Sequence, residues 1–205
     1  MQSRIIPLPL SGSPVRSGSN GSDGSGAAER VDLSQQMLAV IPMAIASVAV
    51  LRHINLDSNR LTNFPVELAS LPSLHWLSLR WNAIEALPDA IGACGSLRHL
   101  DCSFNQISSI SGRIGACKSL ATLLLHDNSL TALPDSLGEL GSSLKELNVD
   151  FNQLSRLPNS IAHLFAPRGH LQALHVRGNP LVSPPPEIVL DGFAALVAFY
   201  VRLVI

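Results

Sequence analysis

Ser103, His126 and Asp150 are the residues whose types could form a hydrolytic triad, and they follow one another at intervals of 23 and 24 residues. In contact, such residues supply a nucleophile, its general base and the group that orients the base. The sequence has no G-x-S-x-G motif, and no loop near Ser103 offers donors aimed at an oxyanion. We therefore expect a polar surface row and no enzyme activity.

Seven histidines and three cysteines are the other side chains that could react or bind a metal. Zinc sites use pairs such as C-x-x-C or H-x-x-x-H, and neither spacing occurs. Cys102 occupies an apolar position, while Cys94 and Cys117 occupy equivalent positions from which they could approach each other. No phosphate-binding G-x-x-x-x-G-K-[ST] motif is present either. We predict buried, reduced thiols, no metal and no cofactor.

The composition narrows the class of protein further. Of the 205 residues, 46% are hydrophobic and 4% aromatic, and the net charge is -1. Without an excess of Lys and Arg to neutralise phosphates, nucleic acid is not an expected partner. An odd number of cysteines and no signal-peptide pattern favour a reducing, intracellular and most simply cytoplasmic location. No apolar run of about 18 residues is present, so a membrane partner is not expected.

A repeat of the form L-x-x-L-x-L-x-x-N-x-L dominates the sequence. It reads LRHINLDSNRL at 51–61 and LATLLLHDNSL at 120–130, and a degenerate first copy is VDLSQQML at 31–38. Its asparagines recur at intervals of 23, 23, 23, 24 and 27 residues, at Asn59, Asn82, Asn105, Asn128, Asn152 and Asn179. A period in this range is typical of a repeat architecture in which neighbouring copies share one core.

The chemistry of the repeat predicts its structure. The alternating L-x-L segment is a short strand with one buried face, and stacked copies form a curved parallel sheet. The Asn amide can satisfy backbone groups at the bend, and the Leu-Pro after it marks the loop that leaves the strand. Leu133, Leu137 and Leu140 then point inward from the other side. The predicted fold is an α/β leucine-rich-repeat solenoid of about seven repeats, with short helical or 3-10 segments on its convex side.

Three segments carry a more specific resemblance: VDLSQQMLAVIP at 31–42, LDCSFNQIS at 100–108 and GNPLVSPPPEIVLDGFAALVAF at 178–199. They resemble the plant intracellular Ras-group-related leucine-rich-repeat family. This resemblance implies a non-enzymatic intracellular scaffold in signalling, linked to small GTPases and plant development. Ser111 replaces the loop proline, Pro184 replaces a leucine, and family members usually carry more repeats. A shortened paralogue is therefore an alternative, as is a fragment of a disease-resistance or receptor-type protein.

Binding is expected on the concave face, meaning the solvent side of the sheet. Residues between the buried leucines point to this face, and we expect Trp76 to be exposed at its centre. The predicted protein-binding residues are His53, Asp57, Trp76, Arg80, His99, Asp101, His126 and Asp150. The neighbouring aromatics leave two interpretations open, a binding hot spot or a structural rim over the bend, at Trp81, Phe104 and Phe151.

The domain boundaries follow from composition. Residues 1–29 are predicted to be a disordered Ser/Gly-rich leader, and their shortage of acidic residues leaves organelle targeting open. Residues 30–186 form the repeat domain, and 187–205 are predicted to be a capping helix over the last repeat. A membrane-associated or partner-docking helix is the alternative for this apolar tail. The sequence leaves the partner and the oligomeric state undetermined.

Overall fold

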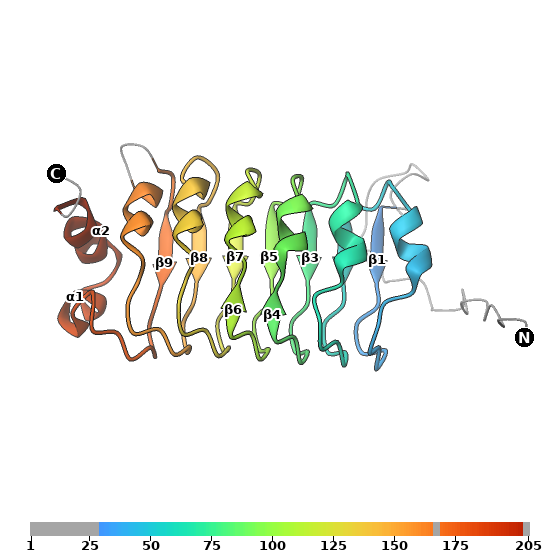
Figure 1. Cartoon of the computed structure of the whole chain (residues 1–205), viewed down its shortest axis with the longest axis horizontal. Coiled ribbons are helices and arrows are strands. Elements are labelled where there is room, and N and C mark those ends of the chain that lie inside the picture. The colour runs from blue at the N-terminus through green and yellow to red at the C-terminus, as the bar shows by residue number, and fades with distance from the viewer. Residues whose placement is uncertain (1–28, 166–168, 203–205) are drawn as a thin grey trace, which may run out of the picture.

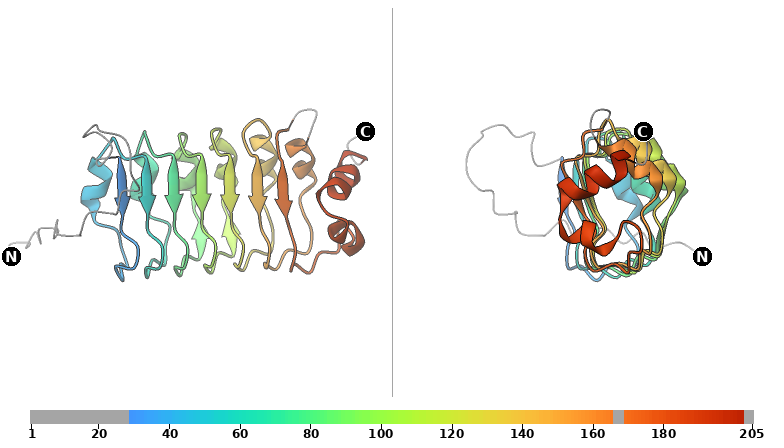
Figure 2. Two further views of the ribbon diagram at one scale, coloured as in Figure 1. Left: turned by 180° about the vertical axis from the view of Figure 1, so that it is seen from behind. Right: turned by 90° about the vertical axis from the view of Figure 1, so that its left-hand side faces the viewer.

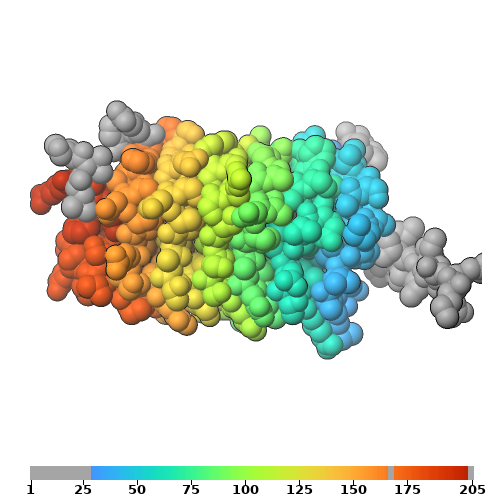
Figure 3. All heavy atoms as spheres, in the orientation of Figure 1, coloured from blue at the N-terminus to red at the C-terminus, as the bar shows by residue number. Residues whose placement is uncertain are grey.

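The computed structural model of the chain describes residues 29–165 and 169–202. The leader predicted for 1–29 lies outside the described residues, apart from Glu29. The described part is one elongated solenoid in which successive repeats lie side by side (Figure 1). In the space-filling view the repeats form adjacent bands across the molecule (Figure 3).

The predicted solenoid is confirmed. Each repeat contributes one three-residue strand to a parallel sheet of seven strands, which lie side by side in Figure 2. In order these strands are β1 (Arg30–Asp32), β2 (His53–Asn55), β3 (Trp76–Ser78), β5 (His99–Asp101), β7 (Thr122–Leu124), β8 (Glu146–Asn148) and β9 (Ala173–His175). The register pairs equivalent residues of successive repeats, so Trp76 lies between His53 and His99.

The convex side is formed by one 3-10 helix in each of the first six repeats. They are η1 (Met43–Ser47), η2 (Val66–Ser70), η3 (Asp89–Ala93), η4 (Gly112–Ala116), η5 (Asp135–Leu140) and η6 (Asn159–Leu164). All but η4 begin after a proline, whose fixed φ suits a helix start. Before η4 stands Ser111, whose hydroxyl instead accepts a hydrogen bond from the Arg113 N–H at 3.0 Å.

A second, two-stranded parallel sheet was not anticipated. It consists of β4 (Ala86–Leu87) and β6 (Ser109–Ile110), which belong to the loops that leave two successive repeats. Each of the two strands begins four residues after an asparagine of the repeat, β4 after Asn82 and β6 after Asn105. Pairing between two-residue strands depends on how close the neighbouring loops lie, and the repeat pattern does not predict that distance.

The core is a continuous column of aliphatic side chains. Leu77, Leu100, Leu123 and Leu147 occupy the same strand position and have no exposed surface. Each asparagine at the bend uses its whole amide. At Asn105, Oδ1 accepts from the Ile84 N–H at 3.0 Å, and Nδ2 donates to the carbonyls of Leu79 and Cys102 at 2.9 and 3.1 Å. These bonds join one repeat to the previous one where no strand can pair.

The last repeat is covered by two helices. The single helix predicted for 187–205 is wrong, because the segment forms α1 (Pro186–Leu190) and α2 (Phe193–Arg202). Gly192 separates them with φ +86, a conformation that side chains with a Cβ rarely adopt. Both helices lie across the end of the solenoid in the right-hand view of Figure 2. In the part of the chain that the structure describes, no helix is long and apolar enough to cross a bilayer.

Candidate functional site

A row of aromatic rings runs across the concave face at the start of three strands. The Trp76 indole stacks on His99 with centroids 5.3 Å apart and an interplanar angle of 5°, and His53 lies 6.4 Å away on its other side. Trp76 is not fully exposed as predicted but half-buried, because the two imidazoles cover part of both ring faces. Burial lowers the pKa of both His53 and His99, which favours the uncharged form of the two imidazoles.

Beside this row lies Asp101, which the sequence predicted to be an exposed binding residue. This prediction is wrong, because only 6% of its surface is accessible. Its Oδ1 accepts from the Ser103 hydroxyl at 2.6 Å and from the Ser103 N–H at 3.0 Å. The half-exposed Arg80 covers its other oxygen, with Nε 3.6 Å from Oδ2. Ser103 thus satisfies one carboxylate oxygen by hydrogen bonds and Arg80 lies at ion-pair distance from the other, so Arg80 is the part of the pair that a partner can contact.

Two further carboxylates of the predicted site connect neighbouring repeats. Asp57 accepts from the Arg80 N–H at 2.9 Å and from the Ser78 hydroxyl. Asp150 accepts from the Arg177 N–H at 2.6 Å. Both aspartates occupy the same repeat position and remain partly exposed. The repeat pattern did not predict that these side chains hold the backbone of the next repeat, and the position that they share was the one signal for it.

The three triad-type residues do not contact one another. Ser103 is fully buried and donates to Asp101. His126 directs Nδ1 to Asp127 Oδ2 at 2.9 Å, and Asp150 holds the backbone of Arg177. A nucleophile needs its general base within hydrogen-bond reach, and each of these groups is occupied elsewhere. The predicted polar surface row is wrong at Ser103, which is buried, whereas His126 and Asp150 remain partly exposed.

A second aromatic row lies at the bend. Trp81 stacks on Phe104 with centroids 4.0 Å apart and an angle of 6°, and Phe104 meets the edge of His126 at 5.0 Å. Arg80 lies over the Phe104 ring, with Cζ 5.8 Å from its centroid. Trp81 is 54% and Phe151 60% exposed, so these rings are a solvent-facing rim and not core.

The rim residues also share a strained backbone. Ser58, Trp81, Phe104, Asp127 and Phe151 all have φ between 53 and 56. This left-handed conformation lets the chain turn sharply so that the next residue, the asparagine, points inward. The position varies in residue type from repeat to repeat, so the sequence pattern did not reveal it. In the last repeat it is occupied by Gly178, with φ +68.

The cysteines lie in the core and are free thiols. Burial raises the pKa of Cys94 to about 12 and that of Cys117 to about 11, and it raises the pKa of Cys102 well above its ordinary value. Cys117 Sγ donates to the Ile91 carbonyl at 3.1 Å. These thiols are poor nucleophiles. Residues 29–165 and 169–202 contain no group of three His, Cys, Asp or Glu side chains placed to hold a metal ion.

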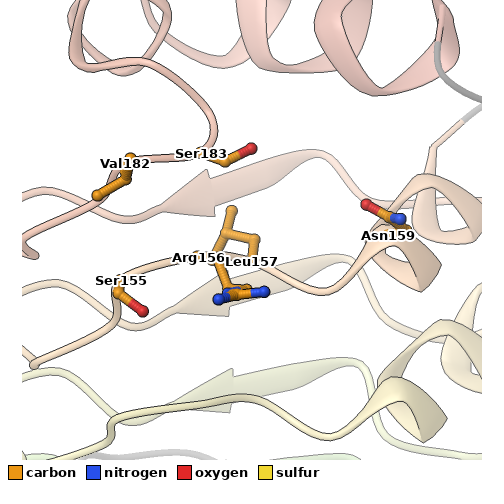
Figure 4. Close-up of a pocket in the computed structure, with 6 residues that line it drawn as sticks. All are labelled: Ser155, Arg156, Leu157, Asn159, Val182 and Ser183. Carbon is orange, nitrogen blue, oxygen red and sulfur yellow. The ribbon is translucent and has the colours of Figure 1, made fainter.

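One open cavity of about 350 Å³ lies away from these rows, between the loops that leave the last two repeats. Figure 4 shows its lining residues on adjacent loops, namely Ser155, Arg156, Leu157, Asn159, Val182 and Ser183. Arg156 is its one ionisable side chain, so the lining offers no acid–base pair. We assign the candidate site to the concave face and its rim instead.

Three family profiles match the chain. "Leucine rich repeat" matches residues 49–107, "Leucine Rich repeats (2 copies)" matches 95–138, and "Leucine Rich Repeat" matches 143–164. The chain belongs to the leucine-rich-repeat family. Leucine-rich-repeat proteins are generally non-enzymatic scaffolds that bind other proteins.

The individual leucine-rich-repeat proteins that this chain resembles match it over only part of their own length. The leucine-rich repeat and calponin homology domain-containing protein of Drosophila melanogaster is 39% identical over 66 residues, which are 32% of this chain and 8% of that protein. A leucine-rich-repeat protein of Leptospira interrogans has 33% identity and a TM-score of 0.68, covering 75% of this chain and 38% of that one.

A third relative is a receptor. The ectodomain of the plant membrane receptor kinase GASSHO1/SCHENGEN3 from Arabidopsis thaliana has 33% identity and a TM-score of 0.61. The match covers 69% of this chain and 17% of the ectodomain, which was solved in complex with CASPARIAN STRIP INTEGRITY FACTOR 2. The present chain therefore spans a minor part of each of these proteins.

Proposed function

We propose that this leucine-rich-repeat protein is an intracellular scaffold whose concave face binds a partner protein, with Trp76 and Arg80 at the centre. The stack of Trp76 between His53 and His99 is the observation that carries the proposal. The stack holds a large ring rigidly while leaving part of it accessible, so little conformational entropy is lost when a partner covers it. Rigid Trp and Arg side chains are the types that dominate binding energies.

The partner we propose is a small GTPase or one of its effectors. This rests on the resemblance of 31–42, 100–108 and 178–199 to the plant intracellular Ras-group-related family. The net charge of -1 and the mixture of acidic and basic residues on the concave face suit a protein surface better than a phosphate backbone. A signalling role follows from that choice of partner, and the buried reduced thiols agree with a reducing compartment.

A receptor-type recognition protein is the second candidate. The similarity to 17% of the GASSHO1/SCHENGEN3 ectodomain favours it, because a short run of repeats can belong to a longer recognition surface. Under this proposal the ligand would be a secreted peptide or protein and not a GTPase. The two candidates use the same face and differ in the partner.

The test measures binding of immobilised full-length chain to purified Ras-type GTPases, each loaded with GDP or a non-hydrolysable GTP analogue. We expect Trp76→Ala to weaken binding by about tenfold or more, the range of an interface hot spot. Arg113→Ala, on the exposed convex side, is the matched control and should bind like the wild type. Equal binding by Trp76→Ala and wild type would exclude the concave face, and no binding to any GTPase would favour the receptor-type candidate.

A further inference from the structure

The first repeat leaves core positions open that every inner repeat closes. Val48 is 40% exposed, while the equivalent residues Leu71, Cys94 and Cys117 are 4%, 5% and 0% exposed. Val31 is also only partly buried, although Ile54 at the same position in the next repeat has no exposed surface. An end that exposes its own core has a free-energy reason to be covered.

The outward positions of this repeat are also unusually apolar. Val50 is 53% exposed, and serine stands at the equivalent position of the following repeats, at Ser73, Ser96 and Ser119. Three further exposed apolar residues of the same repeat are Met37 at 67%, Val40 at 77% and Met43 at 70%. Isolated exposed apolar residues are ordinary, but such a group within one repeat indicates a contact surface.

The strand of this repeat has a free edge. Toward β2, the Glu29 carbonyl accepts from His53 and the Leu33 N–H donates to Asn55, so the odd-numbered residues of β1 face the sheet. Because backbone groups alternate along a strand, those of Arg30 and Asp32 point away from it. Among residues 29–165 and 169–202, no strand pairs with this edge. A free edge is a template for another strand.

We propose that a second copy of this chain pairs with this edge, antiparallel and about a two-fold axis through Val31. In this register Arg30 of each copy stands opposite Asp32 of the other. Residues directly opposite in a hydrogen-bonded antiparallel pair exchange both backbone bonds, and these are the residues whose groups are free. The side chains of Arg30 and Asp32 are exposed and lie on one face, so two symmetric ion pairs form.

Self-complementarity selects a second copy over another occupant. An isologous contact requires each surface to match itself, and the Arg-x-Asp order of β1 meets this requirement only in the antiparallel orientation. The pairing joins the two sheets end to end and places both first repeats against each other. Val48, Val50 and the neighbouring apolar side chains are then covered. The concave faces of both copies stay accessible, so the dimer is independent of the partner proposed above.

The experiment is sedimentation analysis of the full-length chain from about 1 to 100 µM, because association depends on protomer concentration. We expect a concentration-dependent dimer for the wild type. Arg30→Asp places Asp opposite Asp, and Asp32→Arg places Arg opposite Arg. Each should raise the dissociation constant about tenfold or more, since like charges directly opposite repel. Arg113→Asp is the matched control for a changed charge and should dimerise like the wild type.

Two rescues separate this proposal from a loss of folding. In an equimolar mixture of the single variants, both cross-strand pairs again join opposite charges, so a heterodimer should form. The double variant Arg30→Asp/Asp32→Arg should dimerise with itself for the same reason. A wild type that stays monomeric overturns the proposal and leaves the end to residues 1–28 or another protein. A dimer that neither single variant weakens, or that neither rescue restores, places the contact elsewhere and overturns it as well.

Discussion

The two ends of the solenoid are built from the same repeat but differ in how far their apolar side chains are covered. At the C-terminal end, Leu196 and Tyr200 of α2 are 2% and 1% exposed, and the Tyr200 ring lies against Phe165, which is 2% exposed. At the N-terminal end, Val48 is 40% exposed. The difference shows that the repeat pattern alone does not determine whether the side chain at an apolar position of the repeat is buried. Its burial depends on the neighbouring repeat or helix, because each repeat contacts only the elements on either side of it.

The largest predicted effect is at the covered end. Tyr200→Ala should lower the free energy of unfolding by about 3–5 kcal/mol, the range for removing a buried aromatic ring. Tyr200→Phe is the matched control. The Tyr200 hydroxyl is buried and has no hydrogen-bond partner among the described residues, so its removal should leave stability equal or higher. Urea unfolding followed by circular dichroism measures both, and a cost of Tyr200→Ala under about 1 kcal/mol would mean that α2 does not hold this end.

A smaller effect is predicted at the bend of the last repeat. Gly178 has φ +68, and the Phe151 ring lies where a Cβ would stand. Gly178→Ser should therefore cost about 1–3 kcal/mol through backbone strain and displacement of the ring. Ser58, with φ 56, occupies the same position near the other end. Ser58→Gly relieves a left-handed conformation and should change stability by less than about 1 kcal/mol. Equal losses in both variants would remove this distinction between the ends.

At the open end, removing apolar side chains should cost little. Val48→Ala removes methyl groups that are already partly in water, so we expect a loss of less than about 1 kcal/mol in the monomer. The matched variant Leu71→Ala empties the same position one repeat inward and should cost about 2–5 kcal/mol. Urea unfolding at a concentration where the chain is monomeric makes the comparison. A similar cost at both positions would show that the first repeat is already covered.

The smallest predicted effect is a dependence on pH from the middle of the concave face. Burial lowers the pKa of His99 below its ordinary value of 6.5. The unfolded chain then binds more protons than the folded chain once the pH falls below 6.5, so stability is full above that pH and decreases below it. Thermal unfolding should show a lower Tm at pH 5.5 than at pH 7.5. His99→Gln should reduce this difference, and an unchanged difference would place its origin in other groups.

Much of the fold was predictable because it depends on local spacing. The L-x-L alternation sets which residues of Trp76–Ser78 are buried, and the period of the asparagines sets which residues stack. These two spacings alone predict which residues of neighbouring repeats stand beside Trp76, Arg80 and His99. Hydrogen bonding by Asn105 likewise follows from a short amide at a turn that excludes water.

The sequence by itself therefore determined the solenoid, the seven strands of its main sheet, the buried thiols and the face of that sheet on which each strand residue stands. The tertiary structure alone decided which of those residues are accessible. Asp101 is buried between the Ser103 hydroxyl, which donates to one of its oxygens, and the Arg80 guanidinium, which forms an ion pair with the other, whereas Trp76 stays partly exposed between two imidazoles. It also decided that, among the described residues, nothing fully covers Val48 at the N-terminal end. Repeat spacing is encoded locally, but the exposure of a side chain depends on contacts between neighbouring layers, and those contacts exist only after the chain has folded.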